Sequence, residues 1–325
     1  MPKANRNEPN YVIAGWQGVT VEIPDDWNIG AISGDTKQGY VRFDDDTQAR
    51  LEIKWATEQG FVDLDKVVRN YFSDIEKARK KHKQPEIKLD PDIKLMSRRR
   101  RKKSALRCFH WKGEVEAYGA AWLCKDCGRT MIAQVTVPAE MDAADAQEFA
   151  ASVLLSITDH PTDGWALWAA YGFACWIPAE FKLTTQKLMA GLIELEFALE
   201  TERIKVARWG MAGIALKKKN LHDWVGEQMA KTFRKHEAAE PEKVELHGHE
   251  AFATVGTSGL SLAQRVQCFV AHCTGKVYAD RFLARTWHCP DSNRIFYVEA
   301  FLDRDHVGLV DEMVERIQCH ETTEE

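Results

Sequence analysis

GVTVEIPDDWNI (residues 18–29) indicates how this chain is organised, because a stretch of the same pattern, GFACWIPAEFKL, occupies residues 172–183. The two stretches align at an offset of 154, which places Pro24 on Pro178 and Trp27 on Phe181. Both follow the pattern G-hydrophobic-x-hydrophobic-x-hydrophobic-Pro, and the first alternates apolar and polar residues before its proline, the pattern of a half-buried strand that ends in a turn. The sequence therefore predicts that the same strand opens two related segments.

A second pair of stretches repeats further along the chain. AWLCKDCGR (residues 121–129) matches TWHCPDSNR (residues 286–294) at an offset of 165 and gives the recurring pattern W-x-C-x-x-x-x-R. Repeats of this length indicate a duplicated structural unit. We therefore predict an internal duplication, with insertions between the two anchors in the second copy.

Both copies show the same succession of strand and helix patterns. In the first copy, period-2 alternation covers residues 19–23 and 51–55, and apolar residues spaced three or four apart follow at residues 64–75. Further strands are expected near residues 104–137, before a closing helix. The predicted fold class is α+β, with two tandem copies of a β-β-β-α-β-β-β-α unit, each an antiparallel sheet packed with helices.

The turn residues of SITDHPTDGW (residues 156–165) mark the junction between the copies. The predicted organisation is a flexible N-terminus at 1–10, a first repeat at 11–158, a linker at 159–164, a second repeat at 165–320 and a flexible tail at 321–325.

The opening pattern and the closing helix, which ends in VLLSI (residues 153–157), resemble the PsbP-like α/β/α sandwich family. That family includes a photosystem extrinsic subunit and a Ran-binding nuclear transport factor. The resemblance spans nearly the whole chain, twice over, and implies a non-enzymatic binding protein. It carries no binding residue of the family onto this sequence, since fold alone does not fix function.

The composition is that of an ordinary globular protein, with 45% hydrophobic and 29% charged residues. No signal-peptide pattern opens the chain and no apolar run is long enough for a membrane helix, so we expect a cytoplasmic protein without a membrane partner. Eight cysteines in 325 residues are too sparse for a disulfide scaffold, and most are expected to be reduced thiols.

A basic run interrupts the first copy, although the net charge of the chain is -5. It consists of Arg98, Arg99, Arg100, Arg101, Lys102 and Lys103. The second copy has PEKVELHG (residues 241–248) in the matching place, so the shared fold does not require the run. It is either a solvated loop or a binding site for an anionic partner, a protein or a nucleic acid.

The pair Cys124 and Cys127 has the C-x-x-C spacing with which a hairpin turn presents two thiolates to a zinc ion. Candidates for the remaining ligands are Cys108, the adjacent His288 and Cys289, and the histidines of HGHEA (residues 247–251), which also fit a tight turn. The sequence favours a plain structural hairpin over zinc, because Ser292 replaces the second cysteine in the second copy. In such a hairpin the recurring tryptophan and cysteine pack and the arginine bonds the hairpin backbone. A redox-active thiol pair is a further alternative. No cofactor is expected from the sequence, and zinc is the one that these residues could hold.

No Walker loop and no G-x-G-x-x-G, G-x-S-x-G or H-E-x-x-H motif occurs in the sequence. The primary prediction is a non-enzymatic soluble binding or scaffolding protein with two homologous lobes and an unknown protein partner. One alternative is a nucleic-acid-associated or zinc-stabilised module that uses the basic run and the C-x-x-C hairpin. The other alternative is an enzyme with a site between the lobes.

Overall fold

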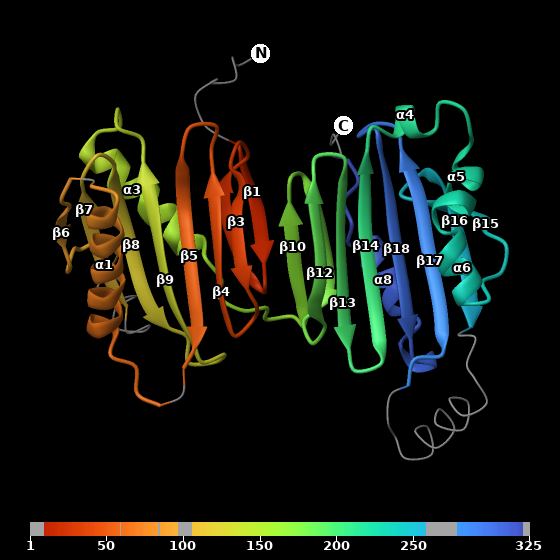
Figure 1. Ribbon diagram of the computed structural model, residues 1–325, viewed down its shortest axis with the longest axis horizontal. Coiled ribbons are helices and arrows are strands. Elements are labelled where there is room, and N and C mark those ends of the chain that lie inside the picture. The colour runs from red at the N-terminus through yellow and green to blue at the C-terminus, as the bar shows by residue number, and fades with distance from the viewer. Residues whose placement is uncertain (1–9, 59, 84, 97–105, 258–277, 321–325) are drawn as a thin grey trace, which may run out of the picture. The chain divides into compact units, whose positions relative to one another are not determined.

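The computed structural model describes residues 10–320, apart from residues 59, 84, 97–105 and 258–277 (Figure 1). The basic run at 98–103 and the predicted tail therefore lie outside the described residues. Contacts between Cα atoms divide the chain into two compact units, Met1–Tyr171 and Gly172–Glu325. We refer to them as unit 1 and unit 2.

Unit 1 is mostly antiparallel sheet. Its elements are β1 (Tyr11–Trp16), β2 (Val19–Pro24), β3 (Asn28–Gly34), β4 (Gln38–Asp44), β5 (Ala49–Thr57), α1 (Leu64–Lys81), β6 (Lys88–Asp90), β7 (Arg107–Lys112), β8 (Glu116–Leu123), β9 (Arg129–Val137), α3 (Ala143–Ser156) and β10 (Trp165–Ala170). Strands β3 to β9 form a seven-stranded sheet in the order β3-β4-β5-β9-β8-β7-β6. Strand β1 pairs with both β2 and β10 in a separate, smaller sheet.

Unit 2 repeats this topology. Its elements are β11 (Phe173–Pro178), β12 (Lys182–Met189), β13 (Leu192–Leu199), β14 (Glu202–Gly210), α4 (Ala212–Ala215), α5 (Leu221–Gln228), α6 (Ala230–Lys235), β15 (Glu242–Leu246), β16 (His249–Thr257), β17 (Arg281–Cys289), β18 (Arg294–Leu302), the 3-10 turn η1 (Arg304–His306) and α8 (Leu309–Glu315). The sheet order β12-β13-β14-β18-β17-β16-β15 matches that of unit 1 strand for strand. The predicted internal duplication is consistent with this match and stays a prediction.

The predicted α+β sandwich of β-β-β-α-β-β-β-α units is wrong. The described residues form three antiparallel sheets, and in unit 1 five strands precede α1 and four lie between α1 and α3. Strand β1 was missed because YVIAGW shows no alternation, and β12 was missed because KLTTQKLM is largely exposed at the edge of its sheet. Strands at edges and in continuous apolar runs lack the period-2 pattern on which the prediction relied.

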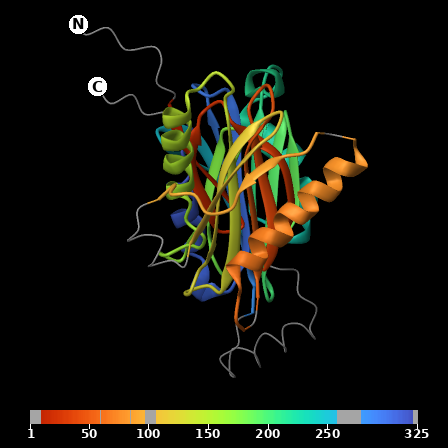
Figure 2. The same cartoon turned by 90° about the vertical axis from the view of Figure 1, so that its left-hand side faces the viewer.

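Helices α1 and α3 cover opposite faces of the unit 1 sheet (Figure 2). Helix α1 begins at the cap Asp63, whose carboxylate accepts hydrogen bonds from two backbone amides, and it buries Val68 and Phe72 against β7 and β8. Helix α3 packs on β8, β9 and β2 and leads the chain back toward the hairpin between β8 and β9. This return path positions the candidate site of unit 1.

Packing under α1 leaves no room for a side chain at Gly119. A Cβ atom there would lie 2.2 Å from the Phe109 ring and 2.7 Å from the carbonyl oxygen of Ala133. We expect Gly119→Ala to lower the free energy of unfolding by about 1–3 kcal/mol, the usual effect of overpacking a core.

The matched control is Gly226→Ala, on the exposed face of α5, where a Cβ meets nothing within 4 Å. Because alanine favours helix over glycine, this variant should gain about 0.5–1 kcal/mol. Urea denaturation of the two full-length variants measures both effects. If the variants were equally stable, the close contact between Gly119 and the Phe109 ring would be contradicted.

Candidate metal centres

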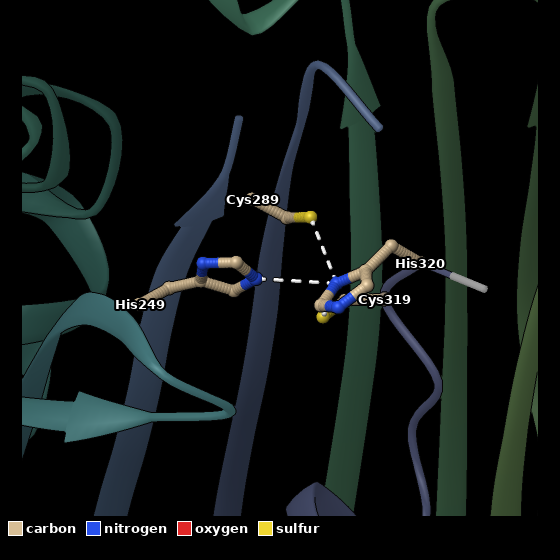
Figure 3. A group of neighbouring side chains, drawn as sticks. All are labelled: His249, Cys289, Cys319 and His320. Atoms are coloured by element: carbon tan, nitrogen blue, oxygen red, sulfur yellow. Dashed lines mark hydrogen bonds between the residues drawn. The ribbon is translucent and has the colours of Figure 1, made fainter. Parts of the chain in front are cut away.

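Four potential metal ligands converge in unit 2 from three parts of the chain (Figure 3). His249 opens β16 directly after a tight turn in which His247 and Gly248 have φ of 52° and 74°. Cys289 ends β17 and is fully buried, whereas Cys319 and His320 follow α8. The predicted turn at HGHEA is thus present, and it delivers one histidine to the cluster.

The distances within this group fit a tetrahedral metal ion. Nδ1 of His320 lies 3.3 Å from Nε2 of His249, 3.4 Å from Sγ of Cys289 and 3.2 Å from Sγ of Cys319. A tetrahedral zinc ion with Zn–N of about 2.0 Å and Zn–S of about 2.3 Å separates two nitrogens by about 3.3 Å and a nitrogen from a sulfur by about 3.5 Å. All four donor atoms lie within 4.8 Å of one another.

Hydrogen bonding alone does not account for the arrangement. One imidazole nitrogen carries either a single proton or a single lone pair, so it can make only one good hydrogen bond. Here three atoms that can bind a metal ion surround Nδ1 of His320 at 3.2–3.4 Å. A cation at the centre would satisfy all of them together.

The surroundings set the protonation of the free ligands. Burial raises the pKa of Cys319 to about 11; the neighbouring Cys289 adds to the rise, and the indole of Trp287 opposes it. Burial also lowers the pKa of His249, which favours the neutral form of its ring. A metal ion would bind the neutral imidazole directly and would have to displace the thiol proton.

A second group of four donors lies in unit 1: Cys124, Cys127, Asp159 and His160, again within 4.8 Å of one another. The two cysteines occupy the turn between β8 and β9, and Asp159 and His160 follow α3. Burial raises the pKa of Cys124 to about 11. Cys127 is half-buried, so this group is more open than the one in unit 2.

The carboxylate of Asp159 organises the unit 1 group. Its Oδ2 accepts a hydrogen bond of 2.8 Å from Nε1 of Trp122, and its Oδ1 lies 2.6 Å from Nδ1 of His160. Burial opposes ionisation, yet the hydrogen bonds from Trp122 and His160 outweigh it and hold the pKa of the carboxyl below its usual value. Nδ1 of His160 also lies 3.5 Å from Sγ of Cys124.

The recurring arginines tie the hairpins to other loops. Arg129 is buried and donates hydrogen bonds to the carbonyl oxygens of Gln17, Thr36 and Asp159. In unit 2, Arg294 donates to the carbonyl oxygen of Gly172 at 2.6 Å. The sequence predicts that this arginine bonds the backbone of its own hairpin. Instead, Arg129 and Arg294 bond other loops and hold the hairpins against them.

The structure redistributes the predicted ligands. Cys124 and Cys127 lie together in the unit 1 group, whereas Cys289 belongs to the unit 2 group. His288 is in neither group: it precedes Cys289 on β17, and alternation directs its side chain to the opposite face of the sheet. Cys108 is buried in β7.

The ligands after the closing helices were missed. Asp159 and His160 follow Ile157, and Cys319 and His320 follow Ile317, at one common offset of 160. The alignment of ITDH (residues 157–160) with IQCH (residues 317–320) was the available signal. The basic residues Arg98–Lys103 lie outside the described part of the chain, so their predicted role stays a prediction.

Comparison with known proteins places the chain in no family. No protein-family model matches the sequence, and no curated protein matches it. Among solved structures, the immunity protein TplEi of T6SS from Pseudomonas aeruginosa, complexed with "L" peptide, is similar at 11% identity and a TM-score of 0.32, over 96% of this chain and 99% of that one. A score this low carries no argument about function, and the PsbP-like resemblance stays a prediction.

None of the helices in the described ranges is long and apolar enough to cross a membrane.

Proposed function

We propose that unit 2 is a zinc-binding domain and that the chain is a non-enzymatic binding protein stabilised by this ion. The observation that carries the proposal is the convergence of Cys289, Cys319 and His249 on Nδ1 of His320 at separations of 3.2–3.4 Å. Two thiolates and two imidazoles form a ligand set that zinc occupies in structural sites.

The donor set favours zinc over other ions and a structural role over catalysis. Thiolate and imidazole ligands exclude Mg²⁺ and Ca²⁺, which prefer oxygen, and tetrahedral S₂N₂ coordination is typical of zinc. Four protein ligands also fill the coordination sphere, whereas a catalytic zinc keeps one position for water or substrate. The ion would therefore join β16, β17 and the segment after α8.

A pair of histidine variants tests this proposal. We expect His249→Ala to lower the zinc content of the full-length protein by one equivalent per chain, measured by plasma emission spectrometry after purification with zinc supplied. His288→Ala is the matched control, because this residue neighbours Cys289 but faces the other side of β17, and it should keep the full zinc content. Equal zinc contents in the two variants would contradict the assignment.

A further inference from the structure

We infer that unit 1 holds a second zinc ion, bound by Cys124, Cys127, Asp159 and His160. This site lies in a different unit from the one proposed above. Its ligand set also differs, because it contains two cysteines, one histidine and one aspartate, whereas the unit 2 set contains two cysteines and two histidines. Its four donor atoms lie within 4.8 Å of one another. Two cysteines, a histidine and an aspartate are all ligands that zinc accepts.

The first argument is the correspondence between the two units. Cys124 and Cys289 occupy the same place in the recurring W-x-C-x-x-x-x-R hairpin, and His160 and His320 occupy the same place after the closing helix. The residue before each histidine is also a possible ligand, Asp159 in unit 1 and Cys319 in unit 2.

Packing alone would not favour Asp159 at the position equivalent to Cys319, because a carboxylate and a thiol differ in shape, charge and hydration. What the two residues share is the ability to bind a metal ion. The fourth donor differs in origin as well: Cys127 comes from the hairpin turn, whereas His249 comes from β16. The two units therefore take their fourth donor from different elements.

The second argument is the hydrogen bonding around Asp159. Nε1 of Trp122 donates to Oδ2 at 2.8 Å, and Arg129 donates to the backbone carbonyl of the same residue at 2.7 Å. The first bond fixes the carboxylate and the second fixes the backbone of Asp159, while Oδ1 faces the imidazole of His160. Hydrogen bonds from outside the ligand set commonly orient metal ligands in this way.

Zinc binding in unit 1 would displace a hydrogen bond. Oδ1 of Asp159 and Nδ1 of His160 are 2.6 Å apart, a hydrogen-bond distance, whereas two ligands of one tetrahedral zinc ion lie about 3.3 Å apart. The ion must therefore remove a proton and separate the two groups. For this reason, and because Cys127 is half-buried, we expect the unit 1 site to bind zinc more weakly than the unit 2 site.

The experiment measures zinc stoichiometry in the full-length chain. The wild type should bind two equivalents, and Cys124→Ser/Cys127→Ser should bind one. Cys108→Ala, which removes a buried thiol of unit 1 outside the group, is the control and should bind two. Asp159→Asn provides a milder variant: the amide can still accept from Trp122, but zinc affinity at the unit 1 site should fall about tenfold or more.

Each outcome separates the two sites. A wild type that binds one equivalent, retained in Cys124→Ser/Cys127→Ser, would overturn the unit 1 site and leave the unit 2 site standing. One equivalent that is lost in that variant would support unit 1 and refute unit 2. A wild type that binds no zinc would overturn both, and two equivalents in every variant would overturn unit 1.

Discussion

Removing zinc from the full-length chain is expected to lower the free energy of unfolding of unit 2 by about 4 kcal/mol when the free zinc concentration had been about a thousand times the dissociation constant. The ion would connect His249 on β16, Cys289 on β17 and the Cys319–His320 segment, which are far apart in sequence. For a unit of this size, the loss corresponds to a fall in melting temperature of about 8–16 °C.

Calorimetry in a zinc buffer and in excess chelator measures this shift. The unit 2 transition of Cys289→Ser should fall at one temperature in both solutions, because its site is already incomplete. Cys175→Ala is the control, since it removes another buried thiol of unit 2 that lies outside the ligand group, and its melting temperature should still respond to zinc. A wild type that melts at one temperature in both solutions would contradict the structural role.

Arg129→Met is expected to destabilise unit 1 by about 3–5 kcal/mol. Arg129 is 7% exposed, and its guanidinium donates to the carbonyl oxygens of Gln17, Thr36 and Asp159 at 2.7–3.0 Å. Methionine fills a similar volume but donates no hydrogen bond, so buried carbonyl groups lose their partner, and each such loss costs about 1–3 kcal/mol. Hydrogen exchange of the full chain should show faster opening at β5 and β9 and no change at β14 and β18.

The control is Arg107→Met, which removes a surface arginine of the same unit. Arg107 pairs with Asp65 at 2.6 Å, but both side chains are about half exposed, and such pairs contribute about 1 kcal/mol or less. If both variants opened β5 and β9 equally, the buried hydrogen bonds of Arg129 would not be what holds the hairpin.

A duplication could be proposed from sequence because its anchors are compact. The W-x-C-x-x-x-x-R pattern places tryptophan, cysteine and arginine within one hairpin, so the two stretches align without knowledge of the fold. Cys124, Cys127 and Cys289 could therefore be proposed as metal ligands. The strand count could not be predicted, because β1 and β12 lack alternation.

The remaining ligands depend on tertiary structure. Asp159 and His160 lie more than thirty residues beyond the unit 1 hairpin, and only the packing of α3 across β8 and β9 returns the chain to it. His288 was proposed because it adjoins Cys289, but neighbours on a strand face opposite sides of the sheet. Metal ligands are therefore identified better by equivalent positions in the two matching stretches than by adjacency in sequence.

X-ray absorption at the zinc edge tests the central claim most directly when applied to full-length Cys124→Ser/Cys127→Ser, in which only the unit 2 ligands remain intact. We predict one bound zinc ion with two sulfur neighbours at about 2.3 Å and two nitrogen neighbours at about 2.0 Å. A zinc-free protein, or an ion surrounded by oxygen alone, would contradict the assignment of His249, Cys289, Cys319 and His320 as its ligands.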